Sequence, residues 1–341
     1  MVTAAKGPAS MSDAATPARA REKGRGRSAD WPSELPLRGW KDIIWRVWHQ
    51  ALEDRITLIA AGAAFYLVLA LFPALAAFVS LYGFVADPAT VADQVAFLGG
   101  LLPAGGIEII RDQLESLAGQ DRNALSIGFV IALLTAFWSA NNGIKTLFEA
   151  LNVAYEEREK RSFLRLNLLA FAFTLGAMAI GIAMVTAVGV VPAALALMRL
   201  GSSSETIIAF LRWPALLIVA GIGISLIYRY GPSRELARWR WVTWGSGLAA
   251  LVWLAASAGF SFYLQNFADY NATYGSIGAV IGLMLWTWIS ALILIVGAEL
   301  NAEMEHQTTR DSTTGAPRAI GERGAVVADT VGESLAESRD G

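Results

Sequence analysis

The sequence contains no cysteine, only two histidines and few charged residues. The lack of cysteine excludes disulfide bonds, thiolate catalysis and thiolate-bound zinc or iron–sulfur clusters. The formal net charge of −2 provides no strong positive field that would attract nucleic acid. We therefore expect no metal, no cofactor and no nucleic-acid partner.

Apolar residues are abundant instead: they make up 55% of the 341 residues, and the mean hydropathy is +0.47. This is more apolar surface than a soluble core of this size can bury. Six long windows contain no Asp, Glu, Lys or Arg: 56–86, 123–144, 166–198, 213–228, 241–268 and 270–298. A helix needs about 20 apolar residues to cross a bilayer. We therefore predict an all-α polytopic membrane protein with six transmembrane helices near 56–83, 124–147, 166–192, 207–228, 241–264 and 275–298.

The distribution of positive charge predicts the orientation of these helices. The fourth window is short, so we extend its helix back to residue 207, which places Arg212 at the outer interface. Lysine and arginine concentrate in the N-terminal segment, in the second and fourth loops and in the C-terminal segment, and only four lie elsewhere. The positive-inside rule then predicts that both termini are cytoplasmic, which agrees with an even number of spans.

The remaining segments divide the chain into three parts. Residues 1–36 are basic and rich in Ala, Pro, Gly and Ser, and residues 306–341 are acidic and rich in small polar residues, so we predict disordered cytoplasmic tails. The central part, 37–305, holds the six helices. Within it, the spacing of apolar residues predicts an amphipathic lead-in helix over 37–54 and an external helical loop over 87–122.

Polar residues at the cytoplasmic end of the second predicted span form the main candidate site. Asn141, Lys145, Glu149 and Asn152 recur at helical spacing and share one face, and Asn142 lies beside them inside the uncharged window. Lys145 and Glu149 are also spaced to form an ion pair. Two interpretations are open: a polar cavity that faces the cytoplasm, or a helix that leaves the membrane here and uses its asparagines to pack against neighbours.

Two further residues stand out, one within an apolar window and one directly after the last. Pro73 removes a helical hydrogen bond and predicts a hinge in the first span. Glu299, at the end of the sixth, is consistent with either a proton- or cation-binding carboxylate or an interfacial anchor. No predicted span contains Asp or His, and nucleotide and metal motifs are missing. We therefore expect that the protein is not an enzyme.

Several motifs are similar to those of a known family: AAFYLVLALFPA at 63–74, FWSA at 137–140, ALNVAY at 150–155, YGSIGA at 274–279 and GAELN at 297–301. The chain resembles the YihY/BrkB family of bacterial inner-membrane proteins over roughly residues 40–305. The resemblance implies a six-helix, multi-pass protein of the bacterial cytoplasmic membrane without an established activity. Some members have been labelled ribonuclease BN or virulence factor, but no cluster of metal ligands supports a nuclease here.

The sequence leaves two functional hypotheses. The first is a transporter-like protein for a small polar solute or an amphipathic lipid, whose cavity is lined by the second-span polar residues together with Tyr274, Ser276 and Glu299. The alternative is a non-transporting scaffold that organises cell-envelope proteins through its external loop and tails. Membrane lipids are the expected partners, and a homo-oligomer is left open.

Overall fold

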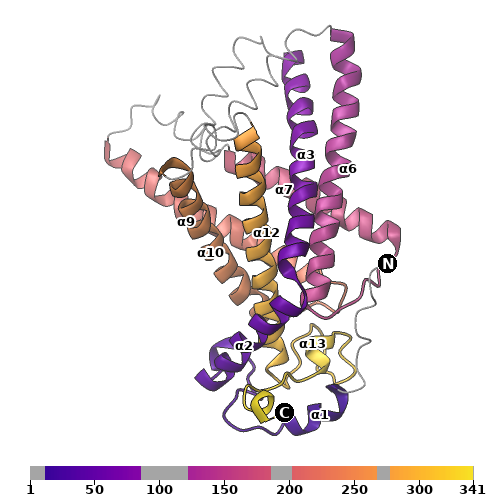
Figure 1. The fold of residues 1–341 in the computed structure, drawn as a ribbon, viewed down its shortest axis with the longest axis vertical. Coiled ribbons are helices and arrows are strands. Elements are labelled where there is room, and N and C mark those ends of the chain that lie inside the picture. The colour runs from indigo at the N-terminus through magenta and orange to yellow at the C-terminus, as the bar shows by residue number, and fades with distance from the viewer. Residues whose placement is uncertain (1–11, 86–121, 186–201, 267–276, 341) are drawn as a thin grey trace.

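The computed structural model describes residues 12–85, 122–185, 202–266 and 277–340, and in these residues it is helical, with no strand. Six long helices occupy the six predicted windows (Figure 1): α3 (Ile56–Val85), α6 (Arg122–Ala154), α7 (Phe163–Val185), α9 (Ser202–Tyr230), α10 (Trp239–Asn266) and α12 (Ile277–His306). Three segments are long and apolar enough to cross a membrane: Phe163–Ile180, Trp239–Leu264 and Val280–His306. The described parts of α3 and α9 contain shorter apolar stretches, Ile56–Ala70 and Pro214–Tyr230.

Small side chains allow α3, α6 and α12 to pack closely. Ala60 and Ala63 of α3, Ala150 of α6 and Ala291 of α12 are buried in one cluster. At Gly143 of α6, an added methyl group would lie 3.1 Å from the side chain of Leu67. Small residues are the usual means by which membrane helices approach each other, because lipid provides no hydrophobic force between them.

The motif at 297–301 explains how α12 is joined to α9 and α10. A side chain at Gly297 would collide with the hydroxyl of Tyr228, which donates a hydrogen bond to the carbonyl of Leu294 (2.7 Å). Asn301 accepts a hydrogen bond from the backbone nitrogen of Gly245 (2.9 Å) and donates one to the carbonyl of Val242 (3.1 Å). The glycine and the asparagine of this motif therefore serve helix packing.

The predicted lead-in helix is present as α2 (Leu37–Glu53). Unlike a helix that packs on a soluble core, it buries charged side chains and exposes apolar ones. Its charged residues Asp42 and Arg46 are buried against the rest of the protein, whereas Ile44, Trp48 and Leu52 are more than half exposed. An exposed apolar stripe opposite a protein-bound polar face is the arrangement expected of a helix that lies on a membrane surface.

Both terminal segments differ from the sequence prediction of disorder. Residues 12–36 and 307–340 fold together against α2 and the end of α12, and they include the short helices α1 (Ser12–Arg19), η1 (Pro32–Glu34), α13 (Val326–Asp329) and α14 (Glu337–Asp340). Figure 1 shows the indigo N-terminal and yellow C-terminal segments side by side at one end of the bundle. We call this structure the terminal cap.

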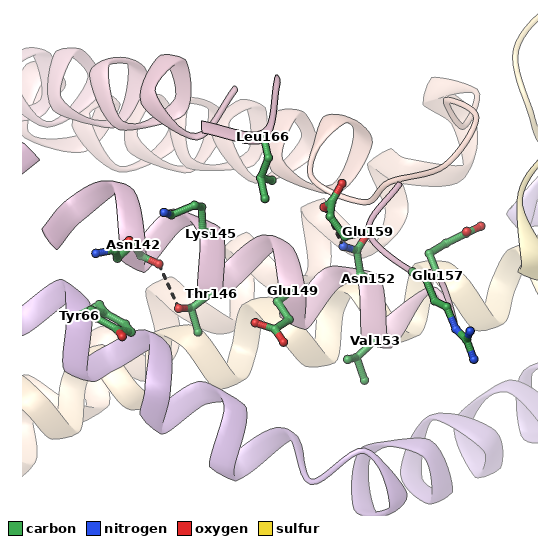
Figure 2. Close-up of a pocket in the computed structure, with 11 residues that line it drawn as sticks. Tyr66, Asn142, Lys145, Thr146, Glu149, Asn152, Val153, Glu157, Glu159 and Leu166 are labelled. Atoms are coloured by element: carbon green, nitrogen blue, oxygen red, sulfur yellow. Dashed lines mark hydrogen bonds between the residues drawn. The ribbon is translucent and has the colours of Figure 1, made fainter. Parts of the chain in front are cut away.

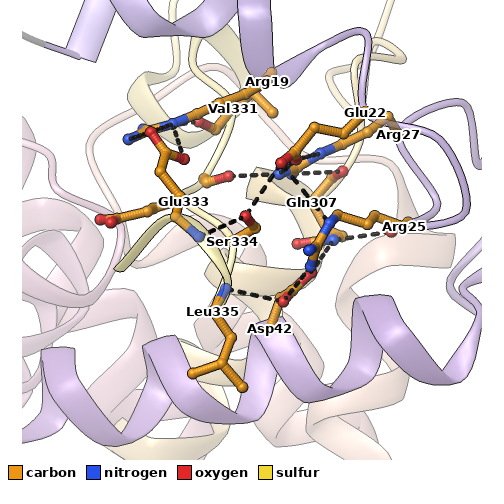
Figure 3. Close-up of polar contacts among 12 residues, drawn as sticks. Arg19, Glu22, Arg25, Arg27, Asp42, Gln307, Val331, Glu333, Ser334 and Leu335 are labelled. Atoms are coloured by element: carbon orange, nitrogen blue, oxygen red, sulfur yellow. Dashed lines mark hydrogen bonds and ion pairs between the residues drawn. The ribbon is translucent and has the colours of Figure 1, made fainter. Parts of the chain in front are cut away.

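The charges that suggested disorder are paired inside the terminal cap (Figure 3). Arg27 donates to Glu22 (2.6 Å) and to the carbonyl of Gly332 (2.8 Å). The carboxylate of Asp42 is 1% exposed and accepts hydrogen bonds from Arg25 (2.8 Å) and from the backbone nitrogen of Leu335 (3.0 Å). Composition indicates disorder only when charges remain solvated, and these charges find partners both nearby in the sequence and, at Gly332 and Leu335, about 300 residues away.

Several predicted features cannot be compared with the structure. The external loop at 87–122 lies outside the described residues except for its last residue, and Tyr274 and Ser276 lie outside them as well. Helix α3 is continuous through Pro73, so the proline does not interrupt the helix. Helix α9 begins at Ser202 and includes Arg212, in agreement with the extension of the fourth span.

Arg46 is the main link between α2, α12 and the C-terminal segment, and its removal should destabilise the fold. It forms a buried ion pair with Glu303 and donates to Gln307 (2.7 Å) and to the carbonyl of Glu333 (2.6 Å). We expect Arg46→Met to lower the free energy of unfolding by about 3–5 kcal/mol, because it leaves a buried carboxylate without its partner. Thermal unfolding of the purified protein in detergent measures this loss.

The matched control is Arg38→Met on the exposed face of α2, which should leave the melting temperature unchanged. Equal effects of the two substitutions would show that the terminal cap contributes nothing to the stability of the protein.

Candidate functional site

A polar pocket of about 450 Å³ lies between α3, α6, α7 and the loop that follows α6 (Figure 2). Its wall is formed by Tyr66, Asn142, Lys145, Thr146, Glu149, Asn152, Val153, Glu157, Arg158, Glu159 and Leu166. Helix α6 supplies six of these residues, because positions three or four apart lie on one side of a helix. The pocket is therefore a feature of one helix face that is completed by residues from three other segments.

Four of the predicted site residues line this pocket: Asn142, Lys145, Glu149 and Asn152. The predicted ion pair between Lys145 and Glu149 does not form, because Lys145 is directed toward α7 and Glu149 toward α3 (Figure 2). The two charges thus lie on different walls of the pocket. A ligand inside it would meet a cation on one side and an anion on the other.

Asn141 faces away from the pocket, toward α7. Its amide nitrogen donates to the side-chain oxygen of Asn167 (3.2 Å), which also accepts from the ammonium of Lys145 (3.2 Å). Asn141 instead lines a second, mostly apolar hollow of about 300 Å³ between α6 and α7. Hydrogen bonds between side chains of neighbouring helices are the expected role of an asparagine in an apolar environment, so the packing interpretation fits Asn141.

The cap-side end of the pocket is held by a network around Asn152. This buried side chain accepts a hydrogen bond from the backbone nitrogen of Ser233 (2.7 Å) and donates to Glu159 (3.1 Å). Glu159 also accepts two hydrogen bonds from the guanidinium of Arg161 (2.6 and 2.7 Å) and one from its backbone nitrogen (2.9 Å). Burial opposes the charge of Glu159, but the hydrogen bonds from Arg161 and Asn152 outweigh it and lower the pKa of Glu159 to about 2. This carboxylate is therefore charged at neutral pH and is fully engaged by the protein.

The terminal cap reaches the rim of the pocket through Glu157. One oxygen of this carboxylate accepts a hydrogen bond from the backbone nitrogen of Val326 in the C-terminal segment (2.9 Å), and the other contacts Lys160 (2.7 Å). Val327 packs into the same hydrophobic cluster as Leu151. The C-terminal segment is consequently part of the pocket's structure.

Three charged groups of the pocket have no oppositely charged partner within the described part of the chain. Lys145 contacts only the amide oxygen of Asn167, and neither Glu149 nor Arg158 forms an ion pair with a described residue. Charges that a protein leaves unpaired in a concave site are available to a ligand. The pocket thus presents two cations and one anion for binding.

Glu299 does not line the pocket. It is 1% exposed, and one of its carboxylate oxygens has no hydrogen-bond partner among the described residues. The charged groups that act on it are Asp54, Glu303 and Glu156, at the junction of α2, α3, α6 and α12. The sequence analysis placed Glu299 in the same cavity lining. In the structure it belongs instead to a separate acidic cluster with Asp54, Glu156 and Glu303.

Other pocket residues were not predicted from the sequence. Asn167, which lines the second hollow and bonds to Lys145, has the same signal as Asn141, an amide inside an uncharged window, and could have been found by that criterion. Glu157, Arg158 and Glu159 belong to a charged run that is typical of any cytoplasmic loop, and Tyr66 lies among apolar residues. The polar groups of α6 in the sequence nevertheless indicated the helix face that lines the pocket.

Comparison with known proteins assigns the family. The sequence profile of the virulence factor BrkB family matches residues 47–320, which include all six long helices and the pocket. The chain belongs to the BrkB family. BrkB-family membership establishes that it is a membrane protein and agrees with the resemblance read from the motifs.

The matched relatives include proteins from distant bacteria. The putative ribonuclease-like protein YfkH of Bacillus subtilis (strain 168) is 32% identical over 248 residues, which cover 71% of this chain and 88% of YfkH. A UPF0761 membrane protein of Nitrosospira multiformis is 24% identical over 79% of this chain and 62% of its own length. One of Tolumonas auensis is 35% identical over 29% of this chain and 33% of its own length. No solved structure matches this BrkB-family chain.

The acidic cluster around Asp54 predicts a pH dependence of stability. Burial, and then the charges of Glu156, Glu53 and Glu303, raise the pKa of Asp54 from 3.8 to about 6. The protonated form is thus favoured by folding, and this contribution to stability is lost as the pH rises through about 6. We expect Asp54→Asn to stabilise the protein at pH 8 by about 1 kcal/mol, since water screens part of the repulsion, and to have no effect near pH 4.

Melting temperatures measured from pH 4 to pH 8 test this expectation. The control Glu322→Gln removes an exposed carboxylate of the C-terminal segment and should give a curve parallel to that of the unmodified protein. A gap between Asp54→Asn and the unmodified protein that is the same at every pH would contradict the assigned titration.

Proposed function

We propose that this protein crosses the bacterial cytoplasmic membrane six times, with both termini in the cytoplasm, and transports a small polar solute or an amphipathic lipid. The observation that carries the proposal is the pocket on α6, where Lys145, Arg158 and Glu149 lack ionic partners among the described residues. We infer that the bound group is zwitterionic, because cations and an anion lie in the same pocket. Either a free amino acid or the headgroup of phosphatidylethanolamine has this chemistry.

The orientation is supported by the terminal cap. The N- and C-terminal segments pack together at one end of the bundle, as an even number of crossings requires (Figure 1). The cap and the loop after α6 contain many of the chain's lysine and arginine residues, and the positive-inside rule places such segments in the cytoplasm. The pocket adjoins the cap through Glu157 and Val326, so it opens at the cytoplasmic end.

Binding and translocation explain the pocket better than catalysis. Two of its three carboxylates, Glu157 and Glu159, are engaged by Lys160 and Arg161, the lining residues contain no histidine, and no hydroxyl of the lining is hydrogen-bonded to the third carboxylate, Glu149. Keeping Lys145 and Asn142 on a helix that continues into an apolar span costs free energy. Polar groups that are retained at such a cost are typical of solute pathways.

Reporter fusions test the orientation. Green fluorescent protein joined to either terminus should fluoresce, because that protein folds in the cytoplasm, and alkaline phosphatase inserted after Gly105 should be active in the periplasm. Phosphatase activity at either terminus would contradict the six-span topology.

Neighbouring asparagines of α6 provide a matched test of the pocket. In proteoliposomes, the unmodified protein should accelerate the flux of radiolabelled alanine, or the flipping of labelled phosphatidylethanolamine if the zwitterion is a headgroup. Asn142→Leu fills the pocket with an apolar side chain and should reduce this flux at least tenfold, whereas Asn141→Leu should leave it within about twofold, because that residue faces α7. Equal fluxes for both variants would rule out the pocket as the binding site.

A further inference from the structure

The buried carboxyl of Glu299 has no role in the pocket and requires an explanation of its own. Its side chain is 1% exposed, and the preceding turn of α12 carries Ile295, which is buried in one apolar cluster with Ile56 of α3. One carboxylate oxygen has no hydrogen-bond donor among the described residues. A charged carboxylate in such a position is unfavourable unless a cation or several donors compensate it.

The neighbours of Glu299 provide no such compensation. Asp54 contributes its charge from the end of α2, Glu156 from the residue pair that follows α6, and Glu303 from the next turn of α12. The nearby guanidinium of Arg46 is already paired with Glu303, and Tyr155, which is buried beside the cluster, offers no positive charge. Like charges that converge on a buried carboxyl favour its protonated form.

The three carboxyl groups of the cluster differ in their exposure to water. Glu156 is exposed, Asp54 is half-buried, and Glu299 is buried. The amide of Gln50 donates to Glu156 (3.2 Å) and leaves the other oxygen of that carboxylate available. The three carboxyls of the cluster therefore range from one in the buried interior to one that water reaches at the cap end.

The cluster also lies at a joint of the fold. Asp54 precedes Arg55, which has a left-handed backbone conformation (φ 51°) that is uncommon for a residue other than glycine and joins α2 to α3. Helix α3 then carries Tyr66 to the wall of the pocket. A change in the charge of Asp54 therefore acts at the first residues of α3, the helix that carries Tyr66.

We propose that Glu299, Asp54 and Glu156 form a proton-binding site, and that protonation of Glu299 is coupled to transport through the joint between α2 and α3. The proposal deepens the proposed function, on which its coupling step rests, by naming the proton as the coupling ion. When Glu299 releases its proton to water, three carboxylates repel each other between α2, α6 and α12. Movement of the α2–α3 joint relieves this repulsion and changes the wall at Tyr66.

Infrared spectroscopy of the full-length protein in lipid nanodiscs tests the proton site directly. The carbonyl stretch of a protonated carboxyl should be present at pH 7, should shift in heavy water, and should disappear in Glu299→Gln, which keeps the shape of the neutral acid. Asp54→Asn removes one repelling charge, so in this variant the band should disappear at a lower pH than in the unmodified protein. The control Glu322→Gln should leave the band unchanged.

A second measurement tests the coupling. In proteoliposomes, an imposed pH gradient should drive alanine against its concentration gradient with the unmodified protein, and Glu299→Gln should abolish this pH-driven uptake while alanine still exchanges across the membrane. A missing band at pH 7, or a band that survives in Glu299→Gln, would overturn the proton site even if alanine is transported. Full pH-driven uptake by Glu299→Gln would overturn the coupling.

The outcomes for the two proposals are distinguishable. A band that depends on Glu299, together with no flux of alanine or phosphatidylethanolamine in any variant, supports the proton site and contradicts the transport function on which the coupling rests.

Discussion

The cost of leaving a polar group without a partner in hydrocarbon determines where the polar residues of this protein lie. Several amides and hydroxyls within the apolar stretches of the described helices bond to neighbouring helices or to their own backbone, as Asn141 bonds to Asn167 and Ser225 to Ser246, although the buried hydroxyl of Ser139 has no such partner among the described residues. Ionic groups are gathered instead at one end of the bundle, in the terminal cap and around the loop after α6. The pocket and the acidic cluster both lie at the boundary between these two regions, where water can reach a helix that is otherwise apolar.

This constraint also explains which parts of the structure could be predicted from the sequence. A helix that crosses a bilayer must be long, continuous and nearly free of charge, so the uncharged windows located all six long helices, although α6 and α12 continue about two turns beyond their predicted ends. Helix α12 extends two turns beyond the predicted end at residue 298, because Glu303 and Glu305 are paired with Arg46 and Arg234. The glutamates after residue 298 suggested that α12 ends there. Because Glu303 and Glu305 are paired with arginines, the helix continues to His306.

The same reasoning separates what was predicted of the candidate site from what was not. Helical periodicity identified the face of α6 that carries Lys145, Glu149 and Asn152, because these positions are related by local geometry. It did not distinguish Asn142 from Asn141, which are adjacent and face different neighbours. The remaining wall depends on contacts between distant segments, such as Glu157 with Val326, and no local pattern encodes these contacts. The sequence prediction of disordered terminal segments differs from the structure for this reason, since composition does not show which charges pair in the folded protein.

The position of the terminal cap has a consequence for any motion of the bundle. Arg46 ties α2 to α12 and to the C-terminal segment, and Glu157 ties the same segment to the loop at the pocket rim. The cap thus bonds to α2, which precedes the α2–α3 joint, and also to Glu157 at the rim of the pocket. If the chain bends at Arg55 while α2 stays bound to the cap, α3 moves, and Tyr66 moves with it. In the proposed coupling, the bonds of the cap to α2 and to the pocket rim would therefore direct the effect of charge at Asp54 and Glu299 to the wall of the pocket, without requiring the whole bundle to rearrange.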